Sequence, residues 1–192
     1  MLDKSVPFVD ILMHRPAGTP LVLPPLPDGY AFRFYRPGDE KSWAKIETAV
    51  LEFPSAWAAR RRFRKLFGDR REALPLRCVF IENPEGEKVA TATAWSVTLG
   101  GLETPWLSSV GVMSAWQGQG LGKAIIGEAL ATVLRLDGDR DVWLHTQTWS
   151  HRAVGIYEGM GFYISRRDDL PGYKNNRVDD AIRILAEVRK GD

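Results

Sequence analysis

The feature that most constrains the fold is a glycine-rich loop between a predicted strand and the longest predicted helix. Residues 106–112 have strand character, residues 117–122 read Gln-Gly-Gln-Gly-Leu-Gly, and residues 121–136 carry apolar side chains at helical spacing. Glycines let the backbone approach a phosphate closely, and the free N–H groups at a helix N-terminus attract anions. Lys123 adds a positive charge in the first helical turn. The segment predicts an anion site, although a helix entry that only needs flexible backbone has the same pattern.

Spacing excludes the two most familiar phosphate loops. A dinucleotide-binding fingerprint starting at Gly118 and Gly120 would need its third glycine where Lys123 stands. A Walker loop would need glycine at Gln117 and serine or threonine at Ala124. The pattern that remains is Gln-x-x-Gly-x-Gly, formed by Gln117, Gly120 and Gly122.

This pattern resembles the acyl-coenzyme A loop of the GCN5-related N-acetyltransferase (GNAT) family, (Gln/Arg)-x-x-Gly-x-(Gly/Ala) between a strand and a helix. Residues 150–162 read Ser-His-Arg-Ala-Val-Gly-Ile-Tyr-Glu-Gly-Met-Gly-Phe. They are similar to a later motif of the family, Asn-x-x-Ala-x-x-(Leu/Ile)-Tyr-x-x-x-Gly-Phe, with Ser150 in place of asparagine. The resemblance extends over nearly all of the chain from residue 30 and implies the GNAT acyl-CoA N-acyltransferase fold.

The periodicities along the chain predict a mixed α/β fold with a sheet of mixed strand direction. Strands are expected at residues 30–35, 76–81, 89–99, 106–112, 141–147, 162–166 and 181–188, and helices after Asp39 and at 56–67, 121–136 and 150–158. This order, β-α-α-β-β-β-α-β-α-β-β, excludes a TIM barrel and a Rossmann unit.

The first 28 residues are expected to form an N-terminal extension to an N-acetyltransferase domain at 29–192. Six prolines punctuate this extension, and repeated proline disfavours a regular helix or a central strand. Residues 8–13 could form a short edge strand.

The resemblance also implies which residues hold the coenzyme. Main-chain groups of the strand before the loop would contact the pantetheine arm, and the loop would surround the pyrophosphate. If the strand at 141–147 splays away from this strand, the unpaired backbone groups need such a ligand. Ser150 is expected either to contact the pantetheine or to cap the following helix. The implied coenzyme-binding residues are Val110, Gly111, Val112, Gln117, Gly118, Gln119, Gly120, Leu121, Gly122, Lys123, Ser150 and Ala153.

Acyl transfer needs a base for the amine, stabilisation of the carbonyl oxygen and an acid for the leaving thiolate. By resemblance, Tyr157 is the acid and the N–H of Val112 polarises the thioester carbonyl; for an isolated tyrosine, core packing would be the alternative. Glu103 and His145 are candidate bases beside a water relay. Transfer can be direct, without a covalent enzyme intermediate, and Cys78 is expected to be inert core.

The charge balance gives no general reason to expect a nucleic-acid partner, since 26 Lys and Arg face 24 Asp and Glu. The one basic cluster, at residues 60–65, is interpreted as the solvated face of a helix, although it could also attract an anionic acceptor or nucleic acid. The three histidines and the single cysteine show no zinc spacing, so no metal is expected. No signal peptide or membrane span is recognisable, which predicts a cytoplasmic location.

The sequence therefore predicts an acetyl-CoA-dependent N-acetyltransferase that moves an acetyl group directly to a primary amine. The acceptor could be a small-molecule amine or an amine of a peptide or protein, with no nucleic-acid or membrane partner, and the chain could be a monomer or a homodimer. The alternative is an acyl-CoA-binding regulatory module of the same fold that transfers nothing.

Overall fold

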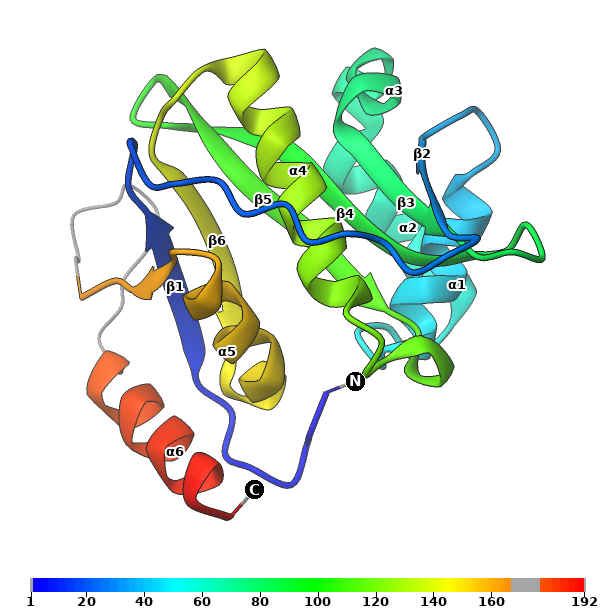
Figure 1. The fold of residues 1–192 in the computed structure, drawn as a ribbon. Helices are drawn as coiled ribbons and strands as arrows, with labels where there is room; N and C mark the ends of the chain where they lie inside the picture. The colour runs from blue at the N-terminus through cyan, green and yellow to red at the C-terminus, as the bar shows by residue number, and fades with distance from the viewer. Residues whose placement is uncertain (1, 167–176, 192) are drawn as a thin grey trace.

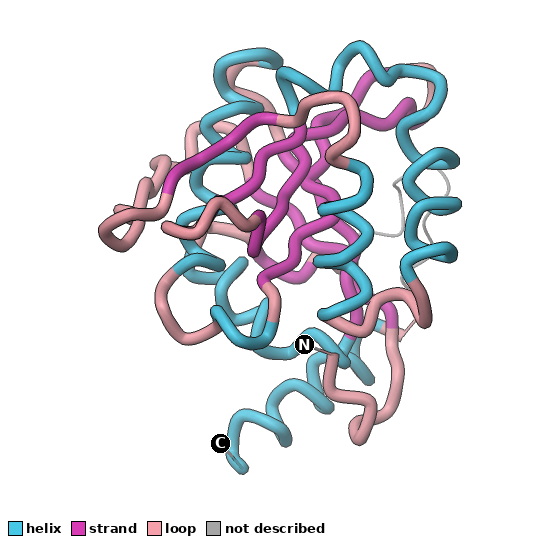
Figure 2. Tube along the Cα trace, turned by 90° about the vertical axis from the view of Figure 1, so that its right-hand side faces the viewer, coloured by secondary structure: helices cyan, strands magenta, loops and turns pink. Residues whose placement is uncertain are grey.

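The computed structural model describes residues 2–166 and 177–191, in which a mixed seven-stranded sheet has helices on both faces (Figures 1 and 2). The strands are β1 (Asp10–Arg15), β2 (Ala31–Phe34), β3 (Cys78–Glu82), β4 (Lys88–Leu99), β5 (Leu102–Val112), β6 (Val142–Gln147) and β7 (Tyr163–Ile164). The helices are α1 (Glu40–Ala49), α2 (Ala56–Phe67), α3 (Leu74–Arg77), α4 (Leu121–Asp137), α5 (His151–Gly159) and α6 (Val178–Gly191), with 3-10 turns at Gly68–Ala73, Ser114–Trp116 and Thr148–Ser150. The order across the sheet is β2-β3-β4-β5-β6-β1-β7. The mixed α/β fold predicted from the sequence is confirmed.

The alternation of side chains along β4 divides the core into two layers. Ala92 and Ala94 pack in the larger cluster, which includes the buried face of α4. Trp95 points to the opposite face and packs with Trp43 of α1 and Phe63 of α2. Because β4 is buried on both faces, the helices of both layers are held in fixed positions around the centre of the sheet.

The N-terminal strand differs from the prediction. β1 is an internal strand: it pairs antiparallel with β6, from Asp10↔Gln147 to Arg15↔Val142, and also with β7. The prediction of an edge strand was wrong. Pro7 and Pro16 lie on either side of β1 and not within it, so all residues of the strand keep the N–H groups that they need to pair with two neighbours.

After Pro16 the chain runs as an extended segment across α4 (Figure 1). The crossing point is Gly127, where a β-carbon would lie 2.8 Å from the main-chain oxygen of Val22. The absence of a side chain on Gly127 therefore allows the segment to lie directly against the helix.

The C-terminal element also differs: residues 181–188 were expected to form a strand and lie in α6. Alternate residues from Ile182 to Val188 are apolar, but so is the helical series Ala181, Ile184, Leu185 and Val188. Acidic residues at the start of this segment and basic residues at its end favour the helix. Ala181 and Leu185 are buried in the main core.

The strand expected from residue 76 begins at Cys78 instead. The preceding residues form α3, in which Pro75 occupies the first turn, where its missing N–H carries no cost.

Candidate active site

The centre of the site is the place where β5 separates from β6. These two parallel strands share one register pair in the part of the chain that is described, Trp106↔Trp143. On the other side of β5 the pairing with β4 shifts between Thr91↔Gly111 and Thr93↔Ser108, and Ser109 adopts a left-handed φ of 53°. This bulge bends β5 just before its C-terminal end. The end of β5 therefore presents main-chain groups towards the gap instead of towards β6.

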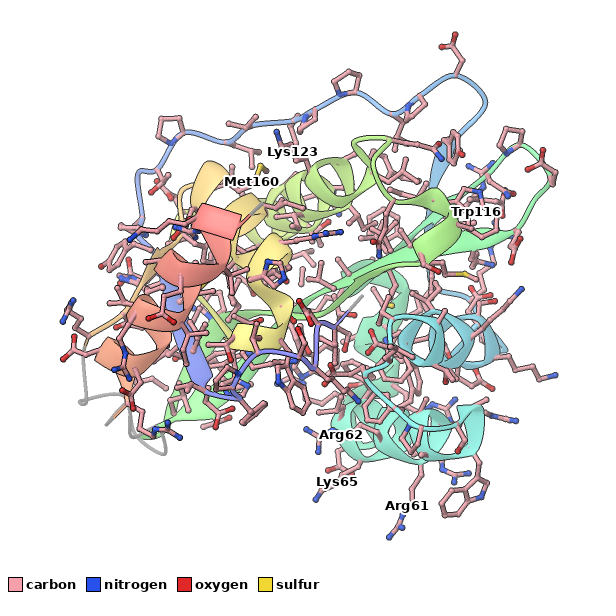
Figure 3. The ribbon with its side chains drawn as sticks, turned by 90° about the horizontal axis from the view of Figure 1, so that it is seen from below. Arg61, Arg62, Lys65, Trp116, Lys123 and Met160 are labelled. Carbon is pink, nitrogen blue, oxygen red and sulfur yellow. The ribbon has the colours of Figure 1, made fainter. Side chains whose placement is uncertain are left out.

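A cleft of about 1100 Å³ runs through this gap. Lys123 lies towards one side of the molecule and Arg62 and Lys65 lie towards the other (Figure 3), although all three line the same cleft. Most of the predicted coenzyme-binding residues line it: Val110, Gly111, Val112, Gln117, Gly118, Gly120, Gly122, Lys123, Ser150 and Ala153. The cleft thus extends from the glycine-rich loop, which lines one end of it, to α2, which lines the other end.

Two of the predicted coenzyme residues do not line the cleft. Gln119 Oε1 accepts a hydrogen bond from the Tyr30 hydroxyl at 3.0 Å. Leu121 directs its side chain into the core and is 1% exposed. Leu121 can offer only its main-chain N–H to a ligand.

The glycine-rich loop has the geometry of an anion cradle. Gly118 and Gly120 have φ values of 81° and 83°, which side chains disfavour. Gly120 is the N-cap of α4, a helix of 17 residues. The first turn of α4 therefore presents free N–H groups and the positive end of the helix dipole to the loop. Gln117 Nε2 donates to the Val112 main-chain oxygen at 2.8 Å and fixes the loop to β5. The strand–loop–helix unit predicted from the sequence is confirmed.

Gly122 allows α4 and α5 to approach each other at the cleft. A β-carbon on Gly122 would lie 3.2 Å from Ile156 Cδ1 of α5. Ser150 precedes α5, and its side chain makes no capping hydrogen bond to the helix. Ser150 lines the cleft, and of the two roles expected for it the structure gives no support to the helix cap.

Tyr157 reaches the cleft from α5 and is 6% exposed. Its ring makes an edge contact with Phe162, with the centroids 5.9 Å apart. Burial raises the pKa of the Tyr157 hydroxyl, and the negative charges of Glu47 and Glu52 raise it further. The hydroxyl therefore keeps its proton at neutral pH, although the raised pKa also makes it a weaker acid.

The two bases expected from the sequence have different surroundings. Glu103 lies outside the cleft lining and accepts hydrogen bonds from Ser96 Oγ at 2.6 Å and Arg70 Nη1 at 3.0 Å. The bonds from Ser96 and Thr98, followed by Arg70, lower the pKa of Glu103 to about 2, which makes it a weak proton acceptor. These observations argue against Glu103 as the base. His145 does line the cleft, and its Nε2 lies 3.0 Å from Asp10 Oδ1.

Glu47 was not selected from the sequence, yet it is the most unusual carboxyl group of the site. It lies on α1, lines the cleft, is 4% exposed, and its Oε1 has no hydrogen-bond partner among the described residues. Burial, followed by the charge of Glu52, raises the pKa of Glu47 to about 8. The signal in the sequence was a glutamate on the apolar stripe of Trp43, Ile46 and Val50, where a carboxylate is costly to bury.

The α2 end of the cleft is largely aromatic. Trp43, Phe53 and Trp95, which pack in the same cluster as α2, line it together with Arg62 and Lys65. Arg62 and Lys65 form no ion pair with a described residue, so their charges remain available at the opening.

The N-terminal segment crosses between the two sides of the cleft. Leu2 N–H donates to the Val50 oxygen at 3.2 Å, and Asp3 N–H donates to the Trp149 oxygen at 2.8 Å. Leu2 therefore becomes part of the cleft lining.

Other chemistry receives little support from the described residues. Cys78 is buried, and burial raises the pKa of its thiol to about 12, so it forms little thiolate at neutral pH. In residues 2–166 and 177–191 no group of three or more metal-binding side chains comes together. Within the same ranges, every helix is too short or too polar to cross a membrane.

Comparison with known proteins identifies the family. Residues 42–162 match the profile of the Acetyltransferase (GNAT) family, which covers more than half of the chain. The chain belongs to the GNAT family. Mycothiol acetyltransferases from Salinispora tropica and Thermobispora bispora are 30% and 31% identical to it in alignments of 159 positions that cover 78% of this chain. The match covers 50% and 52% of those two proteins, so this GNAT chain spans about half the length of the curated relatives.

Solved structures agree with the GNAT assignment. A GCN5-related N-acetyltransferase from Sphaerobacter thermophilus is 25% identical, with a TM-score of 0.66 over 83% of this chain and 49% of that one. A GNAT-family acetyltransferase from Colwellia psychrerythraea has a TM-score of 0.59 at 14% identity, over 83% of this chain and 54% of its own, and shows a shared fold.

Proposed function

We propose that this chain is an acetyl-CoA-dependent N-acetyltransferase that transfers an acetyl group directly to a primary amine. The observation that carries the proposal is the separation of β5 from β6 beyond Trp106↔Trp143. This gap lies next to the glycine-rich loop that precedes α4. A thioester arm needs unpaired main-chain groups along its length, and a pyrophosphate needs a concentration of N–H donors. The end of β5 and the glycine loop, which would supply these groups, both line one continuous cleft.

The residues present fit such a coenzyme. The main chain of Val110, Gly111 and Val112 would pair with the pantetheine arm, and residues 117–123 would surround the pyrophosphate, with Gln119 and Leu121 contributing main-chain groups only. Lys123 adds the side-chain charge, because no described carboxylate pairs with it. Ser150 and Ala153 would contact the arm from the α5 side of the cleft.

In direct transfer the acetyl group passes from the coenzyme to the amine without a covalent enzyme intermediate. Tyr157 would protonate the leaving sulfur, a role supported by its place in the cleft lining; its raised pKa keeps the hydroxyl protonated at neutral pH. The Val112 N–H would donate to the thioester oxygen. The amine acceptor would enter between Trp43, Trp95 and Arg62, at the end of the cleft opposite Lys123. The relatives are mycothiol acetyltransferases, which supports acetyl transfer as the reaction class.

Two measurements test the proposal. Acetyl-CoA at millimolar concentration should raise the melting temperature, because a ligand that binds only the folded state stabilises it. Lys123→Gln should weaken this shift, whereas Lys190→Gln on α6, away from the cleft lining, should leave it unchanged. Thiol release is then followed across a panel of small amines, amino acids and peptides. Binding without thiol release for any amine would favour the acyl-CoA-binding regulatory module, and no binding would contradict both functions.

A further inference from the structure

The carboxyl group of Glu47 is buried, yet none of the described contacts gives it a part in stabilising the fold. Its Oε1 is unpartnered although the side chain is almost completely buried. Buried polar atoms are normally satisfied, and those that are not commonly serve a ligand or a reaction. Glu47 also lines the cleft, so its oxygen is buried by the protein and still borders the space where a substrate would bind.

The position of Glu47 relative to β5 is set by Gly111. A β-carbon on Gly111 would lie 3.2 Å from Ile46 Cγ2 and 3.7 Å from Glu47 Oε1. The missing side chain therefore lets α1 pack closely against the bulged end of β5, with the carboxyl group of Glu47 beside Gly111. Glu47 thus lies beside the strand that would hold the thioester in the proposed function.

Three titratable groups interact electrostatically with Glu47. Glu52, from the turn after α1, raises the pKa of Glu47 through its negative charge. Glu47 in turn raises the pKa of Tyr157 on α5 and of Cys78 on β3, so its charge acts across the cleft. No arginine or lysine is among the groups that shift the pKa of Glu47. The N–H of a neutral acceptor amine would supply the missing hydrogen-bond donor.

We propose that Glu47 is the general base that takes the proton from the acceptor amine. The inference rests on the proposed acetyl transfer. Glu47 Oε1 accepts an N–H proton as the amine nitrogen forms its bond to the thioester carbonyl carbon. The carbon–sulfur bond breaks, and the sulfur keeps the electron pair and receives the Tyr157 hydroxyl proton. Solvent returns a proton to Tyr157 and removes one from Glu47, so the charges balance.

Glu47 fits this task better than the two bases expected from the sequence. Glu103 is held as a carboxylate by Ser96, Thr98 and Arg70, outside the cleft. His145 is in contact with Asp10 on β1, and its side chain is 37% exposed. A base with a pKa near the working pH is both available and strong enough to remove a proton, and the pKa of about 8 gives Glu47 this property.

The test combines Glu47→Gln with two further variants and a surface control. Glu47→Gln should lower kcat about 100-fold and leave the Kd for acetyl-CoA within a factor of two. Wild-type kcat/KM should rise with pH up to about 8, as Glu47 loses its proton.

Glu52→Gln should move this rise to lower pH, since it removes a negative charge that raises the pKa of Glu47. A rise caused by ionisation of the acceptor amine would stay at the same pH in this variant. Glu85→Gln, in the exposed β3–β4 turn, should change neither quantity.

The outcomes separate the inference from the proposed function. If wild-type protein neither binds acetyl-CoA nor releases thiol, the proposed function fails and the inference fails with it. If wild-type protein is active and Glu47→Gln retains its kcat and its pH dependence, Glu47 is not the base. The same conclusion follows if His145→Gln abolishes the pH dependence instead. Loss of acetyl-CoA binding in Glu47→Gln would assign a structural role and would also overturn the inference.

Discussion

Gln117 Nε2 donates a hydrogen bond of 2.8 Å to the main-chain oxygen of Val112, which joins the first residue of the glycine motif to the end of β5. This bond holds the loop in its curved form while the backbone N–H groups remain free for a ligand. We expect Gln117→Ala to weaken acetyl-CoA binding about tenfold, the loss of roughly one hydrogen bond and some preorganisation. Titration calorimetry would measure the change.

Gln119→Ala is the matched control for that experiment. Its amide contacts the Tyr30 hydroxyl and does not line the cleft. An equal loss of affinity in both variants would mean that the Gln117–Val112 bond has no special part in forming the loop.

Tyr157→Phe should reduce kcat by about 10- to 100-fold, because the leaving sulfur then lacks a positioned proton donor. The affinity for acetyl-CoA should stay nearly the same, since the ring that packs against Phe162 is retained. Tyr163→Phe removes a hydroxyl that contacts His14 Nδ1 outside the cleft and should leave kcat unaltered. Steady-state kinetics would decide, and an unchanged kcat in Tyr157→Phe would remove its acid role.

The buried carboxyl of Glu47 should also affect stability. Its folded-state pKa of about 8 lies above the ordinary value of 4.5, so the unfolded chain ionises first as the pH rises. The free energy of unfolding should therefore fall between about pH 4.5 and pH 8 through this group. Glu47→Gln should be more stable than wild type at pH 8.5, by on the order of 3 kcal/mol. Urea unfolding at pH 5 and pH 8.5 measures this, and an equal difference at both values would contradict it.

Arg77 and Asp137 form a two-bonded ion pair that ties α3 to the end of α4. Arg77 Nη1 donates to Asp137 Oδ2 at 2.8 Å and Nη2 donates to Oδ1 at 2.7 Å. The side chains are 15% and 13% exposed, so Arg77→Ala leaves a largely buried carboxylate without its partner. We expect a loss of about 2–3 kcal/mol in unfolding free energy. Arg77→Lys should recover only part of it, since lysine lacks the planar fork.

The exposed pair formed by Arg183 and Asp180 provides the comparison for Arg77. The Arg183 side chain is 67% exposed, and its removal should cost less than about 0.5 kcal/mol. Comparable losses in Arg77→Ala and Arg183→Ala would show that burial does not set the strength of these pairs.

The sequence predicted the parts of the site whose signal is local. The strand, the glycines and the helix of residues 106–137 are consecutive, so their geometry follows from turn and capping preferences. The C-terminal helix was missed because residues 181–188 satisfy both a period of two and a helical period, and only the charges at the two ends decide.

The remaining features depend on contacts between segments that are far apart in the sequence. Glu47 resembles an ordinary helical glutamate until α1 is packed over Gly111, and Glu103 resembles a free carboxylate until Arg70 reaches it. Similarly, β1 could be recognised as a strand, but its place in the sheet depends on β6 and β7. Spacing along one chain does not contain this information.

The place of β1 in the sheet has a consequence for the order of folding. Val9, just before β1, donates its N–H to the Thr148 hydroxyl, 139 residues further along the chain. During synthesis, β1 is made long before either of its neighbours in the sheet, and it must stay unpaired in the meantime. Contacts so distant in sequence close large loops and form slowly. The half of the sheet that contains β6, β1 and β7 is therefore expected to be the last to fold, and the most exposed to mispairing or chaperone capture before then.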